Sequence, residues 1–307
     1  MASSSPPAQA HSVLAIFGPT ASGKTAVGEA VADRIGGEVV SADSAAVYRD
    51  LPVVTASPQR PTRLVGVFPL THEVSVGEYQ RLAHEAIDEL VAAGRTPVVV
   101  GGTGLYLRAA LSSLDLPPPP APGMRERWEE LYDERGAEAA HELLADRDPA
   151  AAARVHANDR RRVVRALELA DAGASLAPET DRLWTEDTRH PTLIVALDVP
   201  QDELDRRIEL RADAMIAHGA VEEARAAWAQ PLSGTARKVM GLEEFATLRL
   251  EDARDAYVQA NRRLARYQRK WLRKMPNVVT LAADRDPQEI ADEIVALAGT
   301  GERLPRR

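Results

Sequence analysis

The chain has 307 residues, of which 45% are apolar and 27% are charged, the composition of an ordinary globular protein. It contains no cysteine, which excludes disulfides, cysteine-ligated zinc and thiol catalysis. The formal net charge of −8 argues against indiscriminate binding to nucleic acid, because contacts to phosphates need lysine and arginine.

The first third of the chain alternates strand patterns with helix patterns. Residues 1–11 are small and polar, and they lack a basic region before an apolar run, so we expect a disordered tail and not a secretory signal. Strands that alternate with helices indicate a parallel sheet covered on both faces. The predicted strands are 12–17, 39–43 and 96–100, and the predicted helices are 25–35, 78–93 and a segment from 105 onward.

The composition changes in the middle of the chain. Residues 116–123 include the run P-P-P-P-A-P-G, which cannot form a helix and is typical of a linker. A helical pattern without strand candidates follows at 124–172, and an irregular segment at 174–190. A strand is then predicted at 192–197, and long helices at 201–229 and 253–274. We therefore predict an α/β fold, a P-loop NTPase-like parallel sheet core (12–116 and 191–300) with helices on both faces, which is interrupted by a helical insertion domain (117–190).

Residues 18–25 read G-P-T-A-S-G-K-T and match the phosphate-loop pattern G-x-x-x-x-G-K-[ST] in full. The glycines let the backbone curl so that successive N–H groups point at an anion, and the following helix adds its positive end. Lys24 would supply a charge to the terminal phosphate, and the Thr25 hydroxyl would ligate Mg²⁺. An ordinary glycine-rich turn is the alternative. The pattern predicts a phosphorylated ligand without saying which one.

Asp43 follows the second predicted strand, where the carboxyl ends of parallel strands open onto a ligand crevice. It could be a general base for a substrate proton, or it could be a helix N-cap or turn residue, and the residues alone leave both readings open. The third strand ends in G-G-T-G at 101–104, which permits close approach of a ligand and offers the Thr103 hydroxyl. No acid follows this strand, whereas a nucleotide hydrolase would usually have one.

Positive charge is concentrated in two segments. Residues 261–274 contain seven basic residues and no acid, and residues 159–165 read D-R-R-R-V-V-R. Local basic faces on an acidic body suit one chosen polyanion, although a solvated helix face is the alternative reading for each segment. We expect one face of the second segment in the core, because Leu264, Tyr267, Trp271 and Met275 recur at helical spacing, and we expect Tyr106 in the core as well.

Four segments together resemble the tRNA dimethylallyltransferases of the MiaA type, the IPP transferase family. They are residues 18–25, 41–48, 94–106 and 156–168, and the last reads H-x-N-D-x-x-R-x-x-R-A-L-E, an uncommon string. Residues 207–215, 219–224 and 262–273 also resemble the family. The resemblance therefore runs, in the expected order, from about residue 12 to residue 275.

The resemblance implies transfer of a dimethylallyl group from dimethylallyl diphosphate to N6 of the adenosine that is 3′-adjacent to the anticodon of a tRNA. The base would be flipped out of its stack, since its exocyclic amine is otherwise inaccessible. Matching positions make Asp43 the general base, place Thr103 near the reacting centre and make Arg211 a stabiliser of the leaving diphosphate. Mg²⁺ is the implied cofactor, with Thr25 as its ligand. The residues implied to bind the diphosphate are Gly18, Thr20, Ala21, Ser22, Gly23, Lys24 and Thr25.

The helical insertion corresponds to the part of the family that grips the anticodon stem-loop, where basic residues hold RNA phosphates. We expect a monomer in the cytoplasm, with tRNA and dimethylallyl diphosphate as partners and no membrane contact. The residues implied to contact tRNA are Asp43, Ser44, Ala45, Ala46, Thr103, Arg125, Arg161, Arg162 and Arg165.

Several positions depart from the pattern of the family. Ala46 stands where the family usually has a glutamine, Ser57 where it has a basic residue, and Gly66 where it has an acid. Leu242 and Glu243 replace an aromatic and a basic residue. Because the catalytic positions are kept, we expect divergence with the activity kept, in which residues 46–66 alter recognition of the base but not diphosphate binding. A paralogue with weakened or altered RNA preference is the alternative.

Three other functions stay open at this point. An adenylate isopentenyltransferase would prenylate a free nucleotide with the same loop and base, but it has less need of an RNA-gripping insertion. A small-molecule kinase would use Asp43 to activate a hydroxyl and residues 124–172 as a lid. A catalytically silent RNA-binding protein would have no use for the intact Lys24, Asp43 and Arg211.

Overall fold

The structure, a computed structural model, describes residues 11–117, 121, 123–177 and 182–300. The expected disordered tail, apart from His11, and much of the proline-rich linker lie outside these residues. The chain divides into two compact units. One joins the residues up to Ser113 to those from Trp184 onward, and the other is Leu114–Leu183. Each unit is described by itself.

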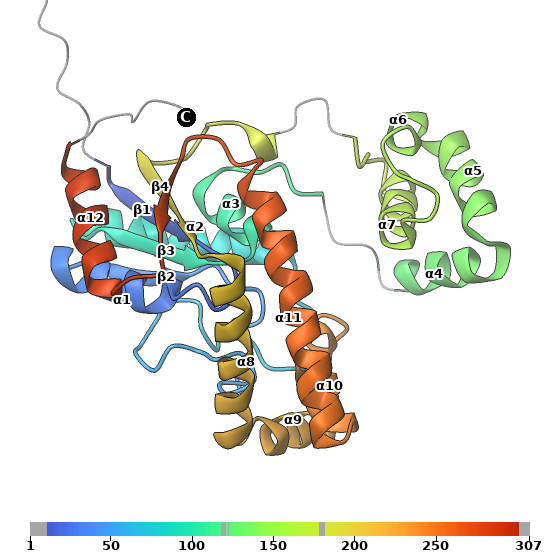
Figure 1. Cartoon of the computed structure of the whole chain (residues 1–307). Coiled ribbons are helices and arrows are strands. Elements are labelled where there is room, and N and C mark those ends of the chain that lie inside the picture. The colour runs from blue at the N-terminus through green and yellow to red at the C-terminus, as the bar shows by residue number, and fades with distance from the viewer. Residues whose placement is uncertain (1–10, 118–120, 122, 178–181, 301–307) are drawn as a thin grey trace, which may run out of the picture. The chain divides into compact units, whose positions relative to one another are not determined.

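The first unit is built on one parallel sheet of five strands in the order β2-β3-β1-β4-β5 (Figure 1). Every residue of β1 and β3 is buried, as expected of central strands that are covered on both faces. The strands are β1 Val13–Phe17, β2 Glu38–Ser41, β3 Pro97–Gly101, β4 Thr192–Asp198 and β5 Val278–Ala282. The parallel α/β class predicted from the sequence is confirmed.

The strand order puts helices on opposite faces of the sheet. The chain passes from β1 to β2 in one direction along the sheet and from β2 back to β3 in the other, and right-handed crossovers then require opposite faces for the two connecting helices. Helix α1 packs against α12, and α2 packs against α3. These helices are α1 Lys24–Ile35, α2 Val76–Ala92, α3 Gly104–Leu111 and α12 Pro287–Thr300.

Four helices between β4 and β5 form what we call the helical arm, residues 201–272. Helix α8 runs away from the sheet, α9 and α10 lie at its far end, and α11 returns beside α8 (Figure 1). The members of the arm are α8 Gln201–Ala217, α9 Ala220–Trp228, α10 Leu242–Thr247 and α11 Leu250–Leu272. The helical pattern predicted over 201–229 is divided into two helices, because Gly219 has a φ of +93° that ends the regular helix.

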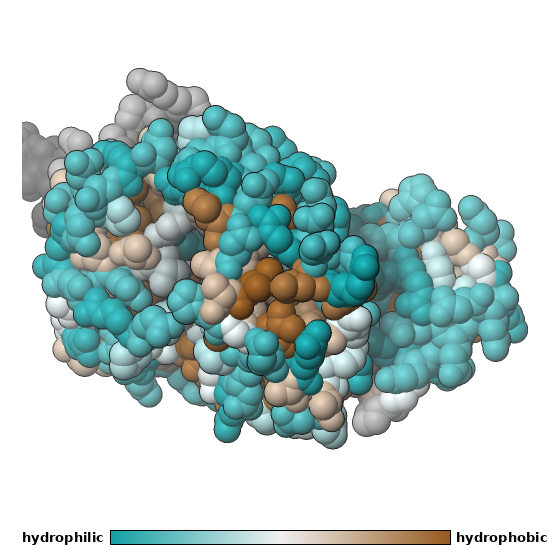
Figure 2. All heavy atoms as spheres, turned by 60° about the horizontal axis from the view of Figure 1, so that its bottom comes forward, coloured by the Kyte–Doolittle hydropathy of each residue, from teal (hydrophilic) through white to brown (hydrophobic). Residues whose placement is uncertain are grey.

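The buried face of α11 differs from the expected one. Of the residues expected in the core, Met275 is buried and Leu264 and Trp271 are half-buried, whereas Tyr267 is 57% exposed. The fully buried side of the helix carries Tyr257, Asn261, Ala265 and Gln268 instead. Together with Leu210, Leu248 and Leu250, Tyr267 is one of the large apolar residues that stay exposed in the described chain, and all four belong to the helical arm. Figure 2 shows an apolar area in the middle of an otherwise hydrophilic face. The expectation for Tyr106 is confirmed, since it is buried.

The second unit consists of helices around its own core. Trp128, Tyr132, Leu144, Val163 and Leu167 are among the buried side chains that form this core. The helical pattern predicted for 124–172 is confirmed as α4 Met124–Arg135, α5 Ala137–Arg147, α6 Pro149–Ala152 and α7 Arg160–Asp171.

The boundaries of this unit differ from the range 117–190 that we expected for the insertion. Residues after Leu183 pack on the first unit instead. The Trp184 and Trp271 rings lie 4.8 Å apart between centroids, and the carbonyl of Asp187 accepts a hydrogen bond from Ser112 at 2.7 Å. No helix in the described part of the chain has both the length and the apolar composition needed to cross a membrane.

Candidate active site

The loop between β1 and α1 curls as its sequence predicts. Ala21 and Gly23 have φ values of +62° and +86°, and no side chain caps the first turn of α1, so its N–H groups stay open to a ligand. Gly18 is required by close packing, because a Cβ atom there would lie 2.5 Å from Oγ of Ser22. This Ser22 oxygen is buried and has no hydrogen-bond partner among the described residues. The loop has the backbone form of an anion cradle.

The side-chain carboxamide of Gln268, on α11, forms a brace that stabilises this loop through hydrogen bonds. Oε1 of Gln268 accepts a hydrogen bond from the Thr20 backbone N–H at 2.8 Å, and Nε2 of Gln268 donates to the Gly102 carbonyl at 2.9 Å. The Thr20 hydroxyl donates to Oδ1 of Asn261 at 3.2 Å. Gln268 and Asn261 are 5% and 4% exposed, so these bonds form away from water. One side chain thereby joins the loop after β1 to the loop after β3.

The basic charge and apolar spacing of residues 261–274 do not by themselves predict this brace. A signal was present, because Asn261 and Gln268 are seven residues apart and share one helix face with Ala265. Two carboxamides on the buried side of a helix need hydrogen-bond partners from neighbouring elements.

Asp43 is both a turn residue and a member of the pocket. Its Oδ1 accepts from the backbone N–H of Ala45 at 2.9 Å and from that of Ala46 at 3.4 Å. Its Oδ2 receives no hydrogen bond from a described residue. The Thr103 hydroxyl accepts from the Ser44 N–H at 3.3 Å and therefore ties this turn to the loop after β3. One carboxylate oxygen shapes the loop while the other stays available to a substrate.

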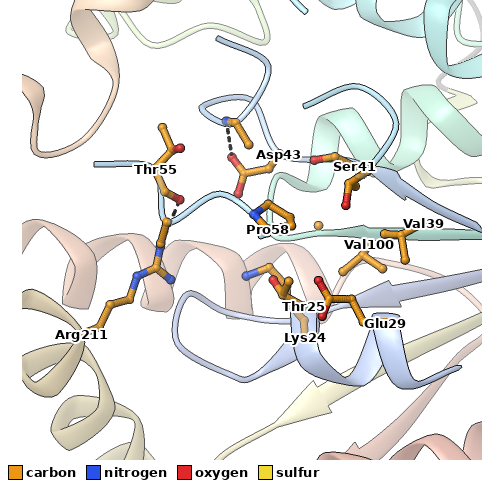
Figure 3. A pocket seen from close by; sticks show the side chains of 14 residues that line it. Lys24, Thr25, Glu29, Val39, Ser41, Asp43, Thr55, Pro58, Val100 and Arg211 are labelled. Carbon is orange, nitrogen blue, oxygen red and sulfur yellow. Dashed lines mark hydrogen bonds between the residues drawn. The ribbon is translucent and has the colours of Figure 1, made fainter. Parts of the chain in front are cut away.

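The cavity next to the phosphate loop contains two cations and carboxylates. Lys24, Thr25, Asp43 and Arg211 line it, and Figure 3 shows that the first two, from α1, lie around one space with Asp43 and Arg211 from other parts of the chain. Glu29 lines the cavity as well. Further members of the wall are Val39, Ser41, Ala46, Thr55, Ala56, Pro58, Thr62, Val100 and Gly101.

The electrostatics of Lys24 and Arg211 suit an anionic ligand. Burial of its ammonium group lowers the pKa of Lys24 to about 8, an effect that Asp43 opposes and that Arg211 reinforces. Nη2 of Arg211 donates to the Thr55 carbonyl at 3.4 Å. Nε of Arg211 is buried without a hydrogen-bond partner among the described residues. A buried donor without a partner and a lysine that is costly to charge both mark a site where a bound anion would be stabilised.

The basic residues expected to contact tRNA fall into two groups. The side chains of Arg161 and Arg162 are exposed on α7, and neither makes an ion pair with a described residue. Arg125 and Arg165 instead bind the carboxylate of Glu168, whose side chain is fully buried, at 2.8 and 2.9 Å. This cluster orders the second unit. A buried carboxylate needs such partners, because an uncompensated charge away from water is costly.

The positions that depart from the family pattern each make defined contacts or have a defined burial in the structure. Ala46 is 4% exposed and its carbonyl accepts from the N–H of Gly66 at 2.9 Å. The Ser57 hydroxyl lies 2.8 Å from that of Thr55. Leu242 is fully buried in α10, where an apolar side chain is suited, and Glu243 is exposed.

These features define a class of protein: an α/β protein whose loop after β1 has the phosphate-loop sequence and lies beside a pocket that also contains a carboxylate. Residues 46–275 match the family described as IPP transferase, and residues 11–66 match the family described as isopentenyl transferase. The chain belongs to the IPP transferase family.

Relatives and solved structures agree with this membership. The chain is 42% identical to a tRNA dimethylallyltransferase of Streptomyces coelicolor, with 92% of this chain and 94% of the relative aligned. It is also 42% identical to one of Anaeromyxobacter dehalogenans, with 92% and 98% aligned. The structure of a tRNA isopentenylpyrophosphate transferase from Bacillus halodurans matches with a TM-score of 0.67 and 30% identity, and covers 95% of this chain and 98% of its own.

Replacement of Gln268 by leucine tests the brace. The change leaves the buried Thr20 N–H and Gly102 carbonyl without partners, so we expect the free energy of unfolding to fall by about 1–3 kcal/mol. We also expect affinity for dimethylallyl diphosphate, measured by calorimetry with Mg²⁺, to fall about tenfold, or ~1.4 kcal/mol. The Gln230→Leu variant, at an exposed position just after α9, is the matched control. Lost stability with unchanged affinity would mean that Gln268 serves only the fold.

The lowered pKa of Lys24 predicts a pH dependence of ligand binding. A bound diphosphate favours the ammonium form, so the pKa of Lys24 is higher in the complex than the value of about 8 in the free protein. Below that pH the amine is already charged, whereas above it each binding event must take up a proton, so affinity falls by up to about tenfold per pH unit. Calorimetry over the alkaline range checks this. The Lys24→Arg variant, which stays charged, should bind with a flatter profile, and a flat profile in the unmodified protein would contradict the assignment.

Proposed function

We propose that the protein transfers the dimethylallyl group of dimethylallyl diphosphate to N6 of the adenosine that is 3′-adjacent to the anticodon of a tRNA, and releases diphosphate. The observation that carries the proposal is the pocket in which Lys24 and Arg211 face the carboxylate of Asp43 beside the phosphate loop. Membership in the IPP transferase family supports it, since curated relatives about 40% identical over most of the chain carry the name tRNA dimethylallyltransferase.

The phosphate loop would hold the diphosphate of the prenyl donor. The uncapped backbone N–H groups at the first turn of α1, the Lys24 ammonium and the Arg211 guanidinium would bind its oxygens. Their charges oppose the negative charge that grows on the diphosphate as its bond to the allylic carbon breaks, so they lower the barrier to departure.

Mg²⁺ fits this site as a cofactor. The Thr25 hydroxyl lies in the pocket beside Lys24, at the first turn of α1. The described residues contain no cluster of three or more His, Asp or Glu that could hold a metal alone. Thr25 and the oxygens of the diphosphate would therefore hold the ion, as is usual for magnesium at phosphates. When bound, it would neutralise part of the charge of the leaving group.

Asp43 would act as the general base. The N6 nitrogen of the flipped adenine attacks the allylic carbon while the carbon–oxygen bond to the diphosphate breaks, and Oδ2 of Asp43 accepts the proton that the nitrogen loses. This oxygen carries no hydrogen bond from a described residue, whereas Oδ1 is fixed by the N–H of Ala45 at 2.9 Å. Thr103 holds the turn of Asp43 through Ser44 and would lie near the reacting centre.

We further propose that exposed cations bind the RNA backbone. Arg161 and Arg162 on α7 are the direct candidates, because their guanidinium groups are exposed. Arg125 and Arg165 would contribute while held by Glu168. The turn from Asp43 to Ala46 would contact the target base. We also propose a cytoplasmic location, because the substrate is tRNA, and a monomeric enzyme, since one chain supplies the loop, the base and Arg211.

Mass spectrometry of tRNA nucleosides tests the proposal. The protein is incubated with dimethylallyl diphosphate, Mg²⁺ and a tRNA whose anticodon is followed by adenosine, and we expect one dimethylallyl group on that adenosine. The Asp43→Asn variant keeps an oxygen for the Ala45 N–H but cannot take the proton, so turnover should fall about 10²–10⁴-fold with little loss of tRNA affinity. Prenylation of free AMP in place of tRNA would favour the adenylate isopentenyltransferase. Consumption of ATP with an unmodified base would favour a kinase.

A charge reversal at Arg162 tests the RNA contact. We expect Arg162→Glu to weaken binding of an anticodon stem-loop and to reduce the salt dependence of that binding, because an ion pair with a phosphate is lost. Diphosphate affinity should stay unchanged. Arg81→Glu is the control for overall charge, since Arg81 is exposed on α2 and pairs only with its neighbour Glu85 among the residues described. Equal loss of both ligands in Arg162→Glu would contradict separate sites.

A further inference from the structure

One wall of the pocket is a short loop that lies far from the phosphate loop in sequence. Residues 51–58 supply Thr55, Ala56 and Pro58 to the wall. The loop is one tight turn, in which the Thr55 N–H and hydroxyl both donate to the Leu51 carbonyl, at 3.0 and 2.7 Å. Ala56 has a φ of +46°, a left-handed conformation that costs free energy for a residue with a side chain. Something outside the loop must therefore help to hold this form.

The carboxylate of Glu223 on α9 supplies that support. The Val53 N–H lies 3.0 Å from each of its two oxygens, and the Val54 N–H donates to Oε1 at 2.7 Å. Both N–H groups belong to the first turn of the loop, where no backbone carbonyl is in position to accept from them. A carboxylate that accepts from backbone N–H groups makes stronger hydrogen bonds than a neutral acceptor does.

The same loop also contacts Arg211. Its Thr55 carbonyl accepts from Nη2 of Arg211 at 3.4 Å, as the dashed line in Figure 3 shows. Arg211 lies on α8 and Glu223 lies on α9, and the two helices meet at Gly219. Two consecutive helices of the arm thus form hydrogen bonds to the same loop, α8 through the Arg211 cation and α9 through the Glu223 anion.

We infer that Glu223 is a positioning residue, which acts through the loop 51–58 to direct Arg211 at the leaving diphosphate. The inference rests on the proposed function for the identity of the anion. Glu223 does not line the pocket, so it has no direct contact with the substrate in this arrangement. Loss of its negative charge weakens the hydrogen bonds from the Val53 and Val54 N–H groups, the loop relaxes, and the Thr55 carbonyl no longer orients the guanidinium.

A double-mutant cycle between Glu223 and Arg211 is the decisive experiment. Glu223→Gln keeps the size of the side chain but removes its charge and places an NH₂ group where Oε2 lies beside the Val53 N–H. We expect kcat for dimethylallyl transfer and affinity for inorganic diphosphate with Mg²⁺ each to fall about tenfold, while KM for tRNA stays constant. In an Arg211→Ala background the same change should cost less than about twofold, because the route through Arg211 is already lost.

The control is the neighbouring glutamate on the same helix. Glu222 is exposed, and Glu222→Gln should keep the activity and the diphosphate affinity of the unmodified protein. If Glu223→Gln does not fold, Glu223→Asp, which keeps the charge on a shorter side chain, takes its place in the cycle, with an intermediate loss expected.

Two results would overturn the inference. One is a Glu223 variant with normal kcat and normal diphosphate affinity. The other is an equal loss in both backgrounds, which would mean that Glu223 acts independently of Arg211. An unmodified protein that transfers no dimethylallyl group would refute the proposed function instead, and the binding of inorganic diphosphate would still decide the role of Glu223.

Discussion

The carboxamide of Gln268 sets the separation between two loops that must act together. One of them carries the phosphate cradle after β1, and the other carries Thr103 after β3. Parallel strands bring both loops to the same edge of the sheet, but strand pairing alone does not fix how far apart their backbones stand. The side chain of Gln268 bonds to both loops from a buried position on α11, so the geometry of the cradle depends on the docking of that helix.

The charges in the pocket show how the fold prepares for an anion. Lys24 and Arg211 come from α1 and α8, and both are held close to a cavity in which Asp43 supplies opposing charge. Asp43 uses one oxygen to close its own turn, so this carboxylate is oriented by the backbone and not by the cations. A base that is positioned in this way can serve a substrate without first being released from an ion pair.

Much of the core and of the phosphate site could be predicted from the sequence, for a physical reason. The strands β1 to β4 and the helix α1 are defined by local patterns, and the loop motif is a short string with a fixed backbone form. The edge strand β5 is only partly buried, but its sequence V-V-T-L-A is apolar enough for it to have been recognised as a strand. The helix break at Gly219 was not predicted, because one glycine within a long amphipathic pattern does not show from sequence alone that its φ is positive.

The contacts made across the fold were harder to predict. Gln268, Asn261 and Glu223 reach the pocket or its loops from the helical arm, and their partners lie more than a hundred residues away in sequence. Arg125 and Arg165 were expected to contact RNA, and the structure shows in addition that both bind the buried carboxylate of Glu168. A sequence pattern gives the residue types but does not predict which buried carboxylate an arginine binds. That ion pair decides whether the arginine side chain faces solvent or stabilises the fold.

The placement of the second unit in the chain has a consequence for biosynthesis. Strand β1 lies at the centre of the sheet and pairs with β4, which the ribosome makes only after the whole of Leu114–Leu183. The second unit is continuous and has its own core, so it is able to fold as soon as it has emerged. Until residue 198 follows, one side of β1 stays unpaired, and an open strand edge is a site where nascent chains associate wrongly. The insertion of Leu114–Leu183 before β4 therefore lengthens the time for which one edge of β1 stays unpaired during synthesis.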